Sequence, residues 1–182
     1  MDLEEFLKNF KLIRLSEDHV LKPFNCGNVD LNDFFLNDSK AYQKQLLAVT
    51  YIIESDDETV AFFSLLNDKI VFETAKDGRK NFWNLLNRSI PNSKRTYSGY
   101  PAMKIGRLGV SSNFQGRDIG TLIIDYLKDL FITNNRTGCK FITVDAYKQS
   151  LNFYIRNGFQ FLTDKDEDDE TRLMYFNLSA ML

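Results

Sequence analysis

The sequence predicts an α/β fold, a sheet of mixed strands with helices on both faces. Short runs of β-branched and aromatic residues alternate along the chain with segments of helical periodicity. Two strand-like runs, Ala48–Glu54 and Thr59–Leu66, flank the polar stretch 55–58, as in a β-hairpin. From Ile119 to Phe131 the apolar residues recur at steps of three and four, which indicates an amphipathic helix.

Length and composition indicate one cytoplasmic domain, residues 1–182. Hydrophobic residues make up 43% of the chain, and the 16 Phe predict an aromatic core. The net charge of −2 argues against a dedicated nucleic-acid binder. Cys26 and Cys139 form neither a C-x-x-C motif nor a disulfide framework, so we expect reduced thiols.

The sequence indicates neither a metal site nor a membrane segment. Its one histidine, His19, excludes a His-rich metal site, and we expect this residue at the surface near a helix or turn. The residues after Met1 are acidic where a signal peptide would be basic. No apolar run approaches the ~20 residues that span a bilayer. We therefore expect no metal and no membrane association.

The first third of the chain predicts scaffold elements. Phe10–Leu15 is an apolar run typical of a strand. Residues 23–28 form a turn in which Asn28 is a plausible helix N-cap. The helix after it has an apolar side made of Leu31, Phe34, Phe35, Ala41 and Tyr42.

Residues 69–103 are the least regular part. An apolar pattern from Phe82 to Ile90 predicts a helix, and Pro91, Gly99 and Pro101 mark its end and the approach to the next strand. The stretch 76–107 is also basic, with eight Lys or Arg residues and one acid. Such a run is either a solvated face or a docking surface for a polyanion such as RNA or the phosphates of CoA.

The last third alternates strands and helices. The predicted elements are a strand at 104–110, the helix from Ile119, a strand at 140–145, a short helix at 150–156 that ends at Asn157-Gly158, and strands at 159–162 and 172–178. The core face of the first helix is predicted to be Ile119, Leu122, Ile123, Tyr126, Leu127, Leu130 and Phe131. The acidic stretch 164–170 predicts a solvated loop.

The segment 115–121 has the chemistry of a phosphate-binding loop. A Gly-containing loop that leads into a helix gathers free backbone N–H groups at the positive end of the helix dipole. Arg117 adds a cation, while Gly116 and Gly120 let a ligand approach the backbone. The segment matches neither the ATP-type nor the dinucleotide loop, and a plain connection between elements is the alternative.

This segment resembles the acyl-CoA loop of the GCN5-related N-acetyltransferases (GNAT), written Q/R-x-x-G-x-G/A. Gln115 and Gly120 match its ends, whereas Asp118 replaces the first Gly and adds a negative charge near a pyrophosphate. The stretch 144–159 resembles the family's later motif, with Phe153-Tyr154 followed by Gly158-Phe159. The resemblance covers about residues 10–178. Residues 24–31 and 100–110 further resemble a toxin-like branch that acetylates aminoacyl-tRNA.

The resemblance implies the GNAT fold, a mixed and mostly antiparallel sheet of six to seven strands, and an enzyme that moves acetyl from acetyl-CoA to a primary amine. A backbone N–H near Val110 would polarise the carbonyl oxygen, and Tyr154 would be the general acid for the CoA thiolate. The acetyl-CoA-binding residues it implies are Leu108, Gly109, Val110, Gln115, Gly116, Arg117, Asp118, Ile119, Gly120, Thr121 and Asn152.

Several alternatives stay open. Tyr154 could be only a core aromatic, Asn152 a solvent-facing residue, and Asp145 either a general base or, as we prefer, a cap of the next turn. The acceptor could be a small molecule, a protein or aminoacyl-tRNA. A non-catalytic acyl-CoA-binding or interaction module is the alternative function. A homodimer and an antitoxin partner are compatible with the sequence.

Overall fold

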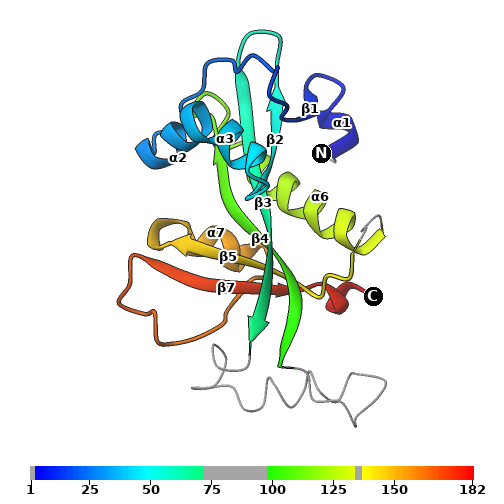
Figure 1. Cartoon of the computed structure of the whole chain (residues 1–182), viewed down its shortest axis with the longest axis vertical. Helices are drawn as coiled ribbons and strands as arrows, with labels where there is room; N and C mark the ends of the chain where they lie inside the picture. Colours follow the sequence, from blue (N-terminus) through cyan, green and yellow to red (C-terminus); the bar gives the residue numbers. More distant parts are fainter. Residues whose placement is uncertain (1–2, 72–97, 134–136) are drawn as a thin grey trace. The chain divides into compact units, whose positions relative to one another are not determined.

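The computed structural model describes residues 3–71, 98–133 and 137–182, which contain one seven-stranded sheet (Figure 1). The strand order is β1-β2-β3-β4-β5-β7-β6. The strands are β1 (Lys11–Arg14), β2 (Val49–Glu54), β3 (Thr59–Val71), β4 (Gly99–Val110), β5 (Phe141–Tyr147), β6 (Gln160–Phe161) and β7 (Thr171–Asn177).

The sheet is mixed and mostly antiparallel, as predicted. β1 with β2, β2 with β3, β5 with β7, and β6 with β7 are all antiparallel pairs. β4 and β5 are neighbours joined through a helix, the connection that a parallel pair requires. The predicted hairpin is confirmed, with Ile52 opposite Phe62 and an irregularity at Ile53 and Glu54.

The helical segments lie between and after these strands. They are α1 (Leu3–Phe6), α2 (Val29–Asp33), η1 (Phe34–Asp38), α3 (Ser39–Lys44), α6 (Ile119–Thr133), η2 (Lys148–Ser150), α7 (Leu151–Arg156) and η3 (Leu178–Met181). The chain divides into two compact units, the first made of Met1–Leu66 and Ile105–Leu130, the second of Asn67–Lys104 and Phe131–Leu182. That the whole chain is one domain stays a prediction.

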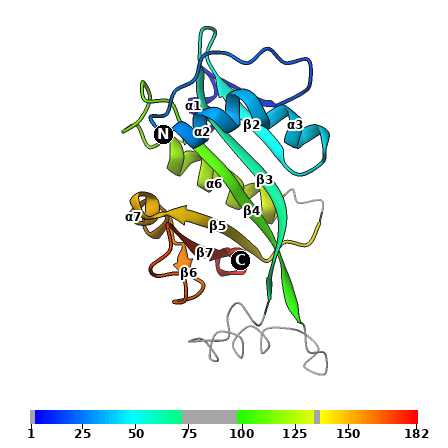
Figure 2. The same cartoon turned by 60° about the vertical axis from the view of Figure 1, so that its left-hand side comes forward.

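In the first unit, two adjacent phenylalanines of β3 fix helices to opposite faces of the sheet. Phe62 stacks on Phe35 of η1 at 4.7 Å between ring centroids, and Phe63 contacts Tyr126 of α6 at 6.4 Å. Successive side chains of a strand point to opposite faces, so α2–η1 covers one face and α6 the other. Figure 2 shows the α2–α3 segment alongside β2 and β3. The prediction of helices on both faces is confirmed.

In the second unit, adjacent aromatic residues of β7 likewise pack on opposite faces of the sheet. Tyr175 meets the buried ring of Phe141 at 5.8 Å, on the face that also buries Ile70 and Tyr100. The next residue, Phe176, faces the other way and contacts Phe159, which packs on Tyr154 of α7. The short helix predicted at 150–156 is therefore held by an aromatic cluster on one face of this unit.

The predicted helix after Asn28 is present but divided into three segments. Asn28 is its N-cap, as expected, because its side-chain oxygen accepts a hydrogen bond from the Leu31 N–H at 3.0 Å. The middle segment, η1, is a π-helix, which periodicity did not predict. Ser39 follows it and donates its hydroxyl to the Phe35 carbonyl at 2.6 Å.

Two details of the later elements differ from the prediction. β4 begins at Gly99 and contains Pro101, which was expected to precede the strand. The exposed Pro101 lacks an N–H, but its carbonyl still accepts a hydrogen bond from the Lys140 N–H at 2.9 Å. On α6 the buried set also includes Ile124 and Lys128, and the ammonium of Lys128 pairs with Asp125 at 3.1 Å.

The acidic stretch 164–170 is not wholly solvated, because the side chain of Asp166 is mostly buried and is paired with Arg172. The Arg172 Nε donates to Asp166 Oδ1 at 2.7 Å, and the two side chains are 10% and 13% exposed. Asp166 Oδ2 accepts the Leu173 N–H at 2.5 Å, and Arg172 Nη2 donates to the Thr163 carbonyl. The other carboxylates of this stretch are exposed. The helix predicted at 82–90 and the basic residues before Lys104 lie outside the described residues.

We predict that Asp166→Ala lowers the free energy of unfolding by about 3 kcal/mol, because it leaves the buried Arg172 charge without its partner. Asp169→Ala, in the same loop but exposed, is the control and should change it by less than about 0.5 kcal/mol. Urea denaturation of both variants measures the difference. Equal stability of the two would contradict the role of the pair.

Candidate active site

The loop predicted to bind phosphate connects β4 to α6 in the first unit. Two backbone hydrogen bonds fix the chain just after β4. Ser111 N–H donates to the Val60 carbonyl, and Ser112 N–H to the Asn25 carbonyl, each at 2.8 Å. The loop therefore leaves the sheet from a point tied both to β3 and to the segment before α2.

The Gln115 side chain closes the base of the loop. Its amide nitrogen donates to the Val110 carbonyl and to the Cys26 carbonyl, each at 2.9 Å. A primary amide has two N–H groups, so a single side chain can satisfy both carbonyls. Gln115 thus positions the loop through its side chain, a role more specific than the ligand contact that the resemblance implied.

Two loop residues have left-handed backbone conformations. Gly116 has φ +76° and Asp118 has φ +58°. Glycine adopts this region freely, and Asp and Asn tolerate it better than other residues. The position of Asp118 therefore explains why glycine is usual there in the acyl-CoA loop and why aspartate can replace it. A Cβ at Gly116 would meet no atom within 4 Å, so the space above that backbone is open.

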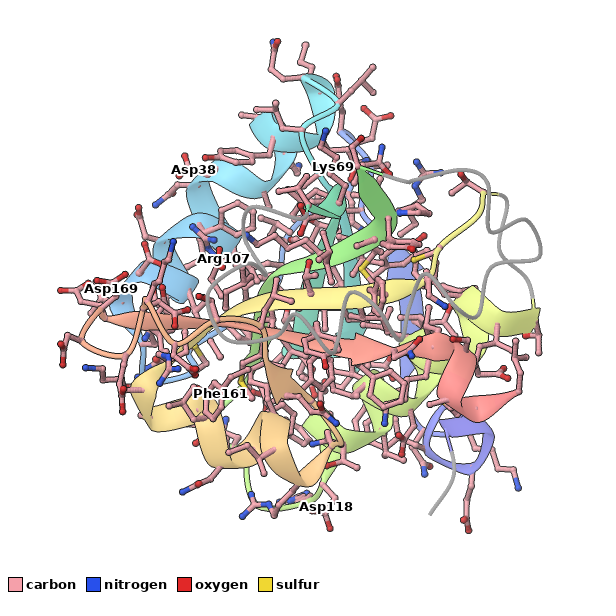
Figure 3. All side chains as sticks on the ribbon, turned by 90° about the horizontal axis from the view of Figure 1, so that it is seen from below. Asp38, Lys69, Arg107, Asp118, Phe161 and Asp169 are labelled. Carbon is pink, nitrogen blue, oxygen red and sulfur yellow. The ribbon has the colours of Figure 1, made fainter. Side chains whose placement is uncertain are left out.

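The start of α6 presents unsatisfied donors. Leu122 N–H bonds to the Asp118 carbonyl at 3.0 Å, which makes Asp118 the residue that precedes the helix. The N–H groups of Ile119, Gly120 and Thr121 form no hydrogen bond with any residue that the structure describes. Together with the helix dipole they suit an anion. Figure 3 shows Asp118 at this end of α6.

Arg117 supplies a positive charge in the same loop. Its guanidinium lies 5.2 Å from the centroid of the Phe114 ring, and Phe114 packs edge-on against Phe10 at 5.8 Å. The guanidinium is exposed, and it packs on the ring of Phe114, which in turn packs on Phe10 of the N-terminal segment. The residues present therefore fit a pyrophosphate.

The end of β4 is shaped by Gly109. A Cβ there would lie 2.8 Å from Phe62 Cε1 and 3.2 Å from Phe24 Cζ, so only glycine lets the strand lie this close to the aromatic core. Leu108 and Val110, on either side, are partly buried. The Val110 carbonyl is used by Gln115. That the Val110 N–H polarises a substrate carbonyl stays a prediction.

Tyr154 and Asn152 lie on α7, in the second unit. The Tyr154 ring is 6% exposed and contacts Phe153 and Phe159 edge-on, with centroids 4.9 Å and 5.3 Å away. Its hydroxyl makes no hydrogen bond to a described residue. Burial raises the pKa of the Tyr154 phenol above its usual value, because the anion would be poorly solvated. Asn152 is exposed on the same helix.

The expectation that Asp145 caps the next turn is wrong. Asp145 lies within β5 and forms an ion pair with Lys104 of β4. A second set of charged groups, in the first unit, surrounds the buried Glu54, whose carboxylate contacts His19 Nε2 and Lys22 Nζ at 3.1 Å each. His19 is therefore a partner of a buried acid, and periodicity gave no signal for this.

The described residues contain no group of three or more His, Cys, Asp or Glu side chains arranged to hold a metal ion. No helix in the described part of the chain is long and apolar enough to cross a membrane. Cys139 is a poor nucleophile, because burial raises the pKa of its thiol.

A profile of the acetyltransferase (GNAT) domain family matches residues 35–179, a range that contains the 115–121 loop and α7. The chain belongs to the GNAT family. The predicted fold class and family are thereby confirmed. So is the predicted enzyme class, that of the acetyl-CoA-dependent N-acetyltransferases. A search of the curated proteins gave no match.

Several solved structures share the fold at low sequence identity. A Tyr-to-Phe mutant of KacT is 18% identical with a TM-score of 0.76, and the match covers 95% of this chain and 97% of that one. AtaT complexed with acetyl-methionyl-tRNAfMet is 17% identical with a TM-score of 0.71, covering 94% and 96%. A mutant AtaT toxin bound to the C-terminus of the antitoxin AtaR and acetyl-CoA is 16% identical with a TM-score of 0.69, covering 95% and 96%.

We predict that Asp118→Ala is less stable than Asp118→Gly by about 1 kcal/mol, because alanine pays a steric cost at positive φ that glycine avoids. Both variants lose the carboxylate, so their comparison isolates the backbone conformation. Urea denaturation monitored by circular dichroism gives the two free energies of unfolding. Equal values would show that residue 118 is not held in the left-handed region.

Proposed function

We propose that this chain transfers the acetyl group of acetyl-CoA to the α-amino group of aminoacyl-tRNA. The observation that carries acetyl-CoA use is the 115–121 loop. It combines N–H groups at the start of α6 that bond to no described residue, the open backbone at Gly116 and the Arg117 cation. These groups would bind the pyrophosphate. The choice of acceptor is supported by the likeness of the fold to AtaT with acetyl-methionyl-tRNAfMet.

In this proposal Tyr154 protonates the leaving group. The amine attacks the thioester carbonyl carbon, the carbon–sulfur bond breaks, and the thiolate needs a proton. A phenol whose pKa is raised by burial stays protonated at physiological pH and can supply that proton. The hydroxyl has no hydrogen-bond partner among the described residues, so it is available as a donor. The thiolate then leaves as the thiol.

The amine must attack in its neutral form. The amino group of an aminoacyl ester has a lowered pKa, so a water molecule can remove its proton and no side-chain base is needed. This agrees with Asp145, whose carboxylate pairs with Lys104. It also agrees with Glu54, which is buried between His19 and Lys22. Neither acid is presented as a free base in its own unit.

We further propose that an antitoxin is the protein partner and the cytoplasm the site of action. The likeness to AtaT bound to the C-terminus of its antitoxin supports the first. The substrate itself, charged tRNA, supports the second. A homodimer remains a prediction from the sequence.

We predict that Tyr154→Phe lowers kcat at least about 100-fold and leaves acetyl-CoA affinity unchanged, because only the proton donor is removed. Radiolabel from acetyl-CoA is followed into aminoacylated tRNA, cellular protein and small amines, and calorimetry measures acetyl-CoA binding. Phe153→Leu, on the same helix, controls for loss of aromatic packing.

Label in the aminoacyl-tRNA pool that falls with Tyr154→Phe but persists with Phe153→Leu would support the proposal. Label in protein or small amines alone would reject aminoacyl-tRNA as the acceptor but would still support acetyl transfer from acetyl-CoA. Acetyl-CoA binding without label in any pool would instead favour a non-catalytic acyl-CoA-binding module, the function that the additional charge of Asp118 makes conceivable.

A further inference from the structure

Arg107 of β4 has an unused hydrogen-bond donor at a position that its surroundings fix. Its Nη1 donates to the Gly106 carbonyl at 2.9 Å, and its guanidinium carbon lies 5.1 Å from the centroid of the Phe34 ring. Its Nε is buried and has no hydrogen-bond partner among the residues that the structure describes. A buried N–H donor left unpaired is costly, so in a native protein it calls for a partner such as an ordered water, an ion or a ligand. Figure 3 shows Arg107 beside the blue α2–η1 segment.

Asp30 balances the charge of Arg107 without satisfying it. The nearest carboxylate oxygen is 3.8 Å from Nε, beyond hydrogen-bonding distance. The two side chains are 37% and 57% exposed, so the ion pair is weak and easily replaced. A guanidinium presents paired donors along one edge, and these match two oxygens of a phosphate.

Arg107 lies on a different face of the first unit's sheet from α6. It shares its face of β4 with Gly109, whose neighbours are Phe24 and Phe62, and with the ring of Phe34. α6, whose start is the phosphate loop, packs against Phe63 on the opposite face. Arg117 in the loop and Arg107 under α2–η1 therefore lie at different places in this unit, and each could bind a different anion.

We infer that Arg107 binds a phosphodiester group of the acceptor RNA through its Nε edge, and that this phosphate replaces Asp30. The inference rests on the proposed function and names the residue that recognises the nucleic-acid part of the acceptor. The chain has a net charge of −2, so RNA is not attracted to its surface in general. A preformed cation with an unused donor provides a specific contact instead.

Two substitutions of Arg107 separate its charge from its geometry. Arg107→Gln removes the charge, so KM for aminoacyl-tRNA should rise at least about tenfold, and the slope of log KM against log salt should fall by about 0.7 to 1. Arg107→Lys keeps the charge but loses the paired donors. It should raise KM about fivefold and keep the salt slope. In both variants kcat should stay within about twofold.

Asp30→Asn should have the opposite effect, because it removes the group that competes with the phosphate. KM for aminoacyl-tRNA should fall about threefold. Lys11→Gln is the control. Lys11 lies on the edge strand β1 and forms an exposed ion pair with Asp56 at 3.4 Å. Its substitution should leave KM and the salt slope unchanged. If Arg107 had only a structural role, Asp30→Asn would raise KM for aminoacyl-tRNA or leave it unchanged.

The inference is overturned if Arg107→Gln leaves the salt slope as in the wild type. It is also overturned if calorimetry shows that this variant loses acetyl-CoA affinity, because the phosphate would then be that of CoA. If the wild-type protein acetylates no aminoacyl-tRNA, the proposed function fails by itself. Titration with deacylated tRNA then decides the inference, with the Gln variant expected to lower the salt slope of binding.

Discussion

The two hydrogen bonds of the Gln115 amide hold together the parts on which the candidate site depends. They join the end of β4, at the Val110 carbonyl, to the segment before α2, at the Cys26 carbonyl. Each bond contributes only about 1 kcal/mol of stability. Their effect on position is larger, because they set where the chain turns before Gly116 and Asp118 take left-handed conformations. The direction in which the first N–H groups of α6 point follows from that turn.

The aromatic core fixes which helices cover which face of the first unit's sheet. Phe62 and Phe63, adjacent in β3, anchor α2–η1 and α6 to opposite faces of the first unit's sheet. Gly109 then lets β4 approach Phe62 and Phe24. The same alternation puts Arg107 under η1, away from the helix whose N-terminus would bind acetyl-CoA. The alternation of side chains along the strands therefore puts the proposed sites for acetyl-CoA and for the RNA phosphate on different faces of this unit's sheet.

Periodicity predicted most of the fold, since the strands predicted at 48–54 and 59–66, the helix from Ile119 and the N-cap Asn28 all depend on local patterns. It did not predict the π-helix η1, the start of β4 at Gly99 or the burial of Asp166, which depend on tertiary contacts. For the site, the loop chemistry was readable because glycines and a helix start are local. The roles of Gln115 and Arg107 were not, because each has a partner about 75 to 90 residues away in the sequence.

The central claim is that the 115–121 loop binds the pyrophosphate of acetyl-CoA, and calorimetric titration of Gly116→Val tests it most directly. Valine would be strained at φ +76° and would fill the open space above the loop backbone. Gly138→Val is the matched control, since a Cβ at Gly138 also meets no atom within 4 Å. The account predicts that acetyl-CoA affinity falls at least about tenfold for Gly116→Val and stays unchanged for Gly138→Val. Equal affinity in the two folded variants would contradict it.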